Sequence, residues 1–115
     1  NHLLLLPKNA DKEANSIRLS ILNTVGVDIG VLITTCINRN FRRGNEAIAL
    51  GISGIMAIDE NDKFNLADAL ANTGQLVLDS SQDIYFAIVR NNNKSFKGNS
   101  KSSELIKANK EVLFY

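Results

Sequence analysis

The chain alternates short apolar runs with a long amphipathic segment, and this alternation constrains its fold most. Leu3–Leu6 and Ile29–Ile33 are runs of strand length, apolar throughout except for Gly30. Between them, residues 10–25 place apolar side chains at three- to four-residue spacing on one face, which predicts a helix. Gly26 is suited to end that helix. A strand, a helix and a strand joined by short connections predict a right-handed parallel crossover.

Farther along, the sequence predicts two more strands and a second helix. Residues 47–58 alternate small and large apolar side chains around Gly51, which predicts a strand with a bend or a close backbone approach. Residues 66–78 show helical spacing, and residues 84–89 form a continuous apolar run typical of a strand. The fold class that follows is α/β (α+β), a mixed sheet with flanking helices in a single domain over residues 1–115.

Composition excludes several classes of function. Hydrophobic residues make up 44% of the 115 residues, enough to form a core. The net charge of +1 comes from 13 basic and 12 acidic residues that are mixed along the chain, which argues against a nucleic-acid partner. The sequence contains no run of about 18 apolar residues, so it predicts no membrane span. One cysteine and one histidine give neither an internal disulfide nor a Cys/His zinc site, so we assign no metal ligands and expect a cytoplasmic protein.

The best candidate site is a basic loop after the predicted strand 29–33. Arg39, Arg42 and Arg43 lie within five residues, followed by Gly44. Guanidinium groups at the carboxyl end of a strand favour a phosphate or carboxylate ligand, and the glycine lets a ligand approach the backbone. No Asp or Glu occurs between residues 34 and 45, so the loop lacks the hard oxygen ligand that a divalent metal prefers. The alternative is a solvated basic loop without a ligand.

Five other candidates have plainer interpretations. Cys36 is a possible nucleophile, but no histidine is near it in sequence, which favours a small buried side chain. Residues 51–54 resemble half of a phosphate loop without its lysine. His2 fits a strand end, the acidic turn at 59–62 fits solvated carboxylates as well as a cation site, and Asp68 fits a charge on a helix surface.

Several segments follow the order of one family's motifs. Residues 4–11 read Leu-Leu-Leu-Pro-Lys-Asn-Ala-Asp, similar to Leu-Leu-Leu-Pro-Glu-x-Pro-Asp, and residues 49–55 read Ala-Leu-Gly-Ile-Ser-Gly-Ile, similar to Ala-Ile-Gly-Val-x-Gly-Ile. Residues 35–44 are similar to the loop Asp-Thr-x-Gly-Arg-Pro-x-Arg-x-Gly, with matches at Arg39, Arg42 and Gly44. Over nearly all its length the chain thus resembles the gamma-glutamyl ligases of the deazaflavin coenzyme F-420, as the C-terminal half of their ligase domain. Because it begins with Asn rather than Met, we expect a missing N-terminal part.

This resemblance implies an activity, cofactors and partners. Members of the family add L-glutamate to the lactyl-phosphate carboxylate of the deazaflavin, use GTP with Mg²⁺ or Mn²⁺, and form dimers. It implies that Arg39 and Arg42 hold nucleotide phosphates and that Gly44 lets the backbone approach. We therefore expect a small-molecule or nucleotide ligand and a homodimer, while the catalytic residues stay unassigned.

Two departures from the family bear on its chemistry. Thr35 stands where the family's loop has an aspartate, and a hydroxyl is a weaker ligand for Mg²⁺ or Mn²⁺ than a carboxylate. Residues 59–65 replace a longer family stretch that contains Asp-Leu-Tyr-Gly-Arg. The sequence predicts a ligase-like protein with degenerate or redirected chemistry. The alternative is a catalytically inactive homologue that acts as a dimeric interaction or ligand-binding module.

Overall fold

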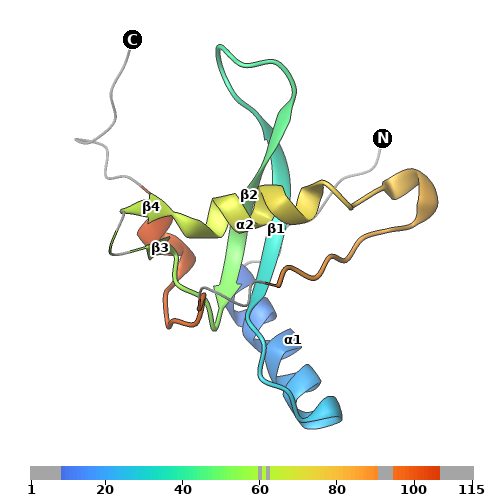
Figure 1. Cartoon of the computed structure of the whole chain (residues 1–115), viewed down its shortest axis with the longest axis vertical. Coiled ribbons are helices and arrows are strands. Elements are labelled where there is room, and N and C mark those ends of the chain that lie inside the picture. Colours follow the sequence, from blue (N-terminus) through green and yellow to red (C-terminus); the bar gives the residue numbers. More distant parts are fainter. Residues whose placement is uncertain (1–8, 60, 62, 91–94, 107–115) are drawn as a thin grey trace.

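The computed structural model describes residues 9–59, 61, 63–90 and 95–106 (Figure 1). Its elements, in chain order, are α1 (Ala10–Val25), β1 (Val31–Asn38), β2 (Asn45–Ser53), β3 (Ile58–Asp59), β4 (Phe64–Asn65), α2 (Leu66–Gln75), and two short 3₁₀ helices at Ser80–Gln82 and Ser102–Leu105. Helices packed on antiparallel strands confirm the predicted α+β class. No helix in these ranges is long and apolar enough to cross a membrane.

Helix α1 has the bounds that the sequence predicts, because both of its ends carry local signals. The Asn9 side chain accepts a hydrogen bond from the Lys12 amide at 3.1 Å, which caps the first turn. Gly26 takes the left-handed conformation with φ 74°, and its N–H donates to the Leu22 carbonyl at 2.9 Å. Ala14 is buried where the helix packs on the hairpin of β1 and β2.

Strands β1 and β2 form an antiparallel hairpin that is the centre of the described structure (Figure 1). The strand predicted at 29–33 begins at Val31 and continues to Asn38, so half of the predicted loop is strand. The connection is therefore a hairpin loop of residues 39–44. The prediction that this loop lies at the carboxyl edge of parallel strands is wrong, because β1 and β2 are antiparallel. The crossover predicted from Leu3–Leu6 lies outside the described residues.

A bulge lies in the middle of the hairpin. Thr34 pairs with Ala49 and Ile33 pairs with Gly51, which leaves Leu50 as the extra residue of β2. A Cβ on Gly51 would clash with the backbone of Ala10 at the start of α1. The close backbone approach predicted at Gly51 is confirmed, and it explains why only glycine fits there.

The outer edge of β2 is covered by polar side chains of α2. Asp68 Oδ1 accepts a hydrogen bond from the Ala49 N–H at 2.8 Å. Asn72 accepts from the Ala47 N–H and donates to the Ala47 carbonyl, both at 2.9 Å. These bonds take the place of a neighbouring strand and fix α2 along the edge. Asp68 is therefore a structural group, and the predicted surface charge is wrong.

Helix α1 covers the same edge beyond the bulge. Asp11 Oδ1 accepts a hydrogen bond from the Ile52 N–H at 2.9 Å. Asp11 Oδ2 also accepts from the Ser102 N–H at 3.1 Å and the Ser102 hydroxyl at 3.0 Å. One carboxylate thus joins α1, β2 and the second 3₁₀ helix.

The core that these contacts enclose is small. Its central cluster is Ala49, Ile52, Ile55, Ala57 and Ala67, and three of these five residues are alanines. Helix α2 begins at the predicted residue but ends at Gln75 instead of Leu78.

The strand predicted at 84–89 is wrong for this structure. Ile84 makes a single bridge to Asp79, and residues 85–90 have no regular structure. A strand needs a neighbour for its backbone groups, and no strand in the described part of the chain pairs with residues 85–90.

Candidate functional site

The arginine loop, residues 39–44, is the tip of the hairpin and stands away from both helices (Figure 1). The Arg42 N–H donates to the Arg39 carbonyl at 3.3 Å, which closes a turn. Phe41 has φ 65° and a side chain that is 94% exposed. A left-handed conformation is uncommon for a bulky residue, so the turn is locally strained.

The three arginines of the loop differ in their surroundings. Arg39 Nε lies 3.1 Å from Glu46 Oε2, and both side chains are substantially exposed. An exposed pair of this kind is weak, about 0–1 kcal/mol, so an anion can compete for Arg39. Among the described residues no carboxylate pairs with Arg42 or Arg43, and both are exposed. Glu46 directly follows residues 34–45, which contain no Asp or Glu. The sequence did not predict its ion pair with Arg39.

Gly44 lets the chain turn from the loop into β2. It has φ 85°, a conformation that side chains with a Cβ rarely adopt. A Cβ there would meet nothing within 4 Å, so the space beside it is open. The residue is needed for backbone conformation and leaves the loop backbone accessible.

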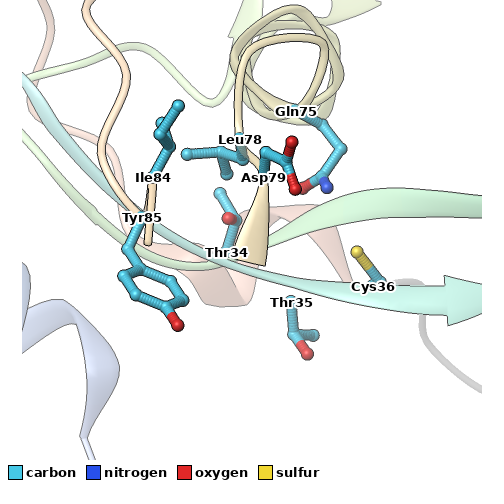
Figure 2. A pocket seen from close by; sticks show the side chains of 8 residues that line it. All are labelled: Thr34, Thr35, Cys36, Gln75, Leu78, Asp79, Ile84 and Tyr85. Carbon is cyan, nitrogen blue, oxygen red and sulfur yellow. The ribbon is translucent and has the colours of Figure 1, made fainter. Parts of the chain in front are cut away.

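A second feature is an open hollow of about 430 Å³ beside β1 (Figure 2). It is lined by Thr34, Thr35, Cys36, Gln75, Leu78, Asp79, Ile84 and Tyr85. No arginine or lysine lines it, and Asp79 is its one carboxylate. Cys36 precedes Arg39 by three residues, which is about 10 Å along an extended chain. The hollow and the arginine loop are therefore separate features of one hairpin.

The residues at these places do not fit a divalent metal. In Figure 2 the Thr35 side chain points to the opposite face of β1 from Thr34 and Cys36. Asp79 Oδ1 already accepts hydrogen bonds from the Ser81 N–H at 3.0 Å and the Ser81 hydroxyl at 2.6 Å. Within the described ranges, no three His, Cys, Asp or Glu side chains come together as a metal site would require.

The family is decided by comparison with known proteins. The model for F420-0:Gamma-glutamyl ligase matches residues 1–92. The chain belongs to this ligase family. It is 36% identical over 96% of its length to "Coenzyme F420:L-glutamate ligase" of Methanocaldococcus jannaschii. Proteins of the same name in Methanococcus maripaludis strain C6 and in Methanopyrus kandleri are 36% and 26% identical over 95% and 98% of the chain.

The chain spans about half the length of these relatives. It covers 49% of the M. jannaschii and M. maripaludis proteins and 52% of the M. kandleri protein. The resemblance seen in the sequence is thus confirmed at the level of the family. The residues that match the ligase loop motif, Arg39, Arg42 and Gly44, all lie at the hairpin tip, whereas Thr35 lies within β1.

The remaining candidates of this ligase-family chain have structural surroundings. Cys36 is exposed, so the predicted buried position is wrong. Asp59 is buried and accepts a hydrogen bond from the Asn61 N–H at 3.1 Å, which makes it part of the turn and not simply solvated. Gly54 packs against the Arg18 side chain, and no phosphate loop forms around it. His2, Glu60 and Asp62 lie outside the described residues.

Among the described residues, an ion pair between Arg18 and Asp28 shifts a pKa. Arg18 donates to both carboxylate oxygens of Asp28, at 2.7 and 2.9 Å, and so joins α1 to the segment before β1. These hydrogen bonds hold the pKa of Asp28 below its ordinary value. The segment that joins α1 to β1 lies at the opposite end of the hairpin from the arginine loop (Figure 1), so the pair serves the fold and not that loop.

The residues of the hollow show which signal the sequence lacked. Gln75, Asp79 and Tyr85 meet β1 through tertiary packing alone. Each is an ordinary polar or aromatic residue in its local segment, with no motif around it. A local pattern therefore could not have found them.

Proposed function

We propose that this chain carries the phosphate-binding element of an amide-forming ligase, in which a nucleotide activates a carboxylate for attack by L-glutamate. The observation that carries the proposal is the arginine loop, which displays three guanidinium groups at an exposed hairpin tip. In this proposal Arg39 and Arg42 contact phosphate oxygens, and the backbone at Gly44 approaches the same anion. GTP is the nucleotide that the resemblance implies.

The surroundings of the loop support this assignment. Arg42 has no competing ion pair in the described part of the chain, so its planar fork can bind phosphate in a bidentate way. Arg39 can exchange its weak contact with Glu46 for a ligand oxygen. Because the residues described do not fit Mg²⁺ or Mn²⁺, no catalytic step is assigned to a metal. The chemistry proposed is thus redirected or degenerate relative to the family.

Thermal unfolding with and without GTP tests the proposal. With GTP at ten times its dissociation constant, binding stabilises the fold by about 1.4 kcal/mol, which raises Tm by roughly 5 °C. We expect this shift in the unmodified chain, a loss of most of it in Arg42→Ala, and its retention in Lys12→Ala, which removes one positive charge from the exposed surface of α1. No shift with GTP, or equal shifts in both variants, would refute the proposal.

A second candidate function is a catalytically inactive homologue that forms a homodimer or binds a ligand in the cytoplasm. The observation in its favour is Thr35, a hydroxyl in place of the loop aspartate that its family motif carries. Calorimetry with Mn²⁺ tests this second candidate. This second function predicts no heat of binding for the unmodified chain or for Thr35→Asp, and measurable binding by the unmodified chain would count heavily against it.

A further inference from the structure

The segment 84–89, called the apolar segment below, is exposed although its sequence is apolar throughout. Tyr85 is 60% exposed, Phe86 89% and Ile88 81%. Aromatic and branched side chains of this size normally bury most of their surface in a folded domain. A run of six apolar residues, five of them of this size, indicates an interaction surface that the described part of the chain leaves partly uncovered.

Both faces of the apolar segment contain exposed side chains. Phe86 and Ile88 would share one face of an extended strand, whereas Tyr85 and Val89 would share the other. Val89 is 37% exposed, so both sets contain accessible side chains. Continuous apolar runs without polar alternation are typical of strands buried on both faces. The partner must therefore be a folded polypeptide that supplies a neighbouring strand and buries the apolar side chains on both faces. A small ligand would bury too little of this apolar surface.

The apolar segment starts beside an open strand edge. Ile84 and Tyr85 line the hollow together with Thr34 and Cys36 of β1. In the described structure β1 pairs with β2 alone. Figure 1 shows the apolar segment on the β1 side of the hairpin and β3 and β4 on the β2 side.

The register shows which backbone groups of β1 face this open edge. The N–H of Ala49 points away from β1, because it donates to Asp68. Its register partner Thr34 must then direct its own N–H and C=O away from β2. The same holds for Cys36, whose partner Ala47 bonds to Asn72. No group in the described part of the chain pairs with them, so they are suited to accept another strand.

We propose that the apolar segment and the open edge of β1 bind the half of the ligase-family domain that this chain does not cover. Relatives of which the chain covers 49% have about as much polypeptide again. The core of this chain, with three alanines among its five central residues, leaves its large apolar side chains for such a partner. The proposal names the partner as that polypeptide, on the same chain or on another, and it does not depend on nucleotide binding.

Co-expression on separate chains tests the proposal. The probe is the half of the M. jannaschii ligase that this chain does not match, with its own affinity tag and without nucleotide. We expect co-purification at equal stoichiometry, and slower amide hydrogen exchange at residues 84–89, Thr34 and Cys36 by about 100-fold, since a paired strand exchanges only by opening. A protein that co-purifies without this protection overturns the proposal, and so does a failure to co-purify.

Matched variants keep the test specific. Phe86→Asp should weaken the complex at least about tenfold, because it places a charge in the buried contact. Phe64→Asp, at a 65% exposed position in β4, should leave affinity unchanged. Circular dichroism checks that both variants fold. Equal weakening by both refutes the surface, and a homodimer of this chain alone that protects residues 84–89 to the same degree refutes the named partner.

Discussion

Replacing Asp68 by alanine should destabilise the fold far more than a surface mutation does. The Asp68 carboxylate accepts the Ala49 N–H at 2.8 Å through Oδ1 and the Asn65 side-chain amide at 2.8 Å through Oδ2. Ala49 is 8% exposed, so water cannot fully replace the lost acceptor. The substitution leaves a buried backbone donor unpaired at the edge of β2 and removes one of the hydrogen bonds that hold α2 to the strand, while those of Asn72 remain.

The magnitude follows from these two bonds. A buried donor left without an acceptor costs about 1–3 kcal/mol, and the bond lost here is to a charged group. The bond to Asn65 adds a smaller amount, since Asn65 is half-exposed and water can replace its partner. We expect a loss of about 2–3 kcal/mol in the free energy of unfolding, against 0.5 kcal/mol or less for an ordinary surface change. With an m-value of roughly 2 kcal/mol/M, the urea midpoint falls by about 1 M.

Urea unfolding followed by circular dichroism measures this loss, with Glu13→Ala as the matched control. Glu13 lies in the first turn of α1 as Asp68 lies in the first turn of α2, so both changes remove a carboxylate that favours the helix dipole. Only Asp68 bonds to a strand. Asp68→Asn keeps an acceptor for Ala49 and should fall between the two. If Asp68→Ala and Glu13→Ala shift the midpoint equally, the carboxylate does not fix α2 to β2.

Two further predictions concern glycine packing and pH. Gly51→Ala should destabilise the fold by about 1–3 kcal/mol through its clash with Ala10. Gly74→Ala, in α2, adds a Cβ that meets only the Ala87 side chain at an ordinary contact distance, so it should stabilise the fold by about 0.5–1 kcal/mol. Urea midpoints that shift in the same direction would contradict this. The lowered pKa of Asp28 means that its pairing with Arg18 stabilises the fold above the ordinary carboxyl pKa of 3.8, and that this stability is lost as pH falls through the lowered value. The midpoints of the unmodified chain and of Arg18→Gln should therefore converge only below that pH, and a constant difference down to pH 2 would refute the pairing.

Sequence reasoning succeeds for α1 because its determinants are local. The Asn9 cap, the apolar spacing and Gly26 all act within a few residues of the helix, so they can be seen without the fold. Helix α2 begins at the predicted residue, where the Asn65 side chain caps it, but Gly74 weakens its last turn and it ends at Gln75. The signals that bound α1 are strong and local, whereas the end of α2 depends also on packing.

Strand prediction fails where a partner decides the outcome. Residues 34–38 form strand because β2 pairs with them, although the sequence placed them in the loop that follows residues 29–33. Residues 84–89 form a continuous apolar run typical of a strand. They stay irregular because no neighbour in the described part of the chain pairs with them. An apolar strand pattern indicates only that a segment favours pairing. Whether it forms a strand depends on a neighbouring strand, which the local sequence does not identify.

The same dependence on a partner extends to the arginine loop. β1 leads directly into Arg39, so any strand that added to the open edge of β1 would run toward the hairpin tip. In the described structure no other element packs beside the arginine loop, so its arginines are exposed to water. Exposed arginines bind a phosphate weakly because water and salt screen the charges. A body seated on that edge would exclude part of this water and strengthen the contacts of Arg39 and Arg42 with an anion. A partner on the open edge of β1, as proposed above, would therefore cover the exposed apolar segment and strengthen anion binding at the arginine loop.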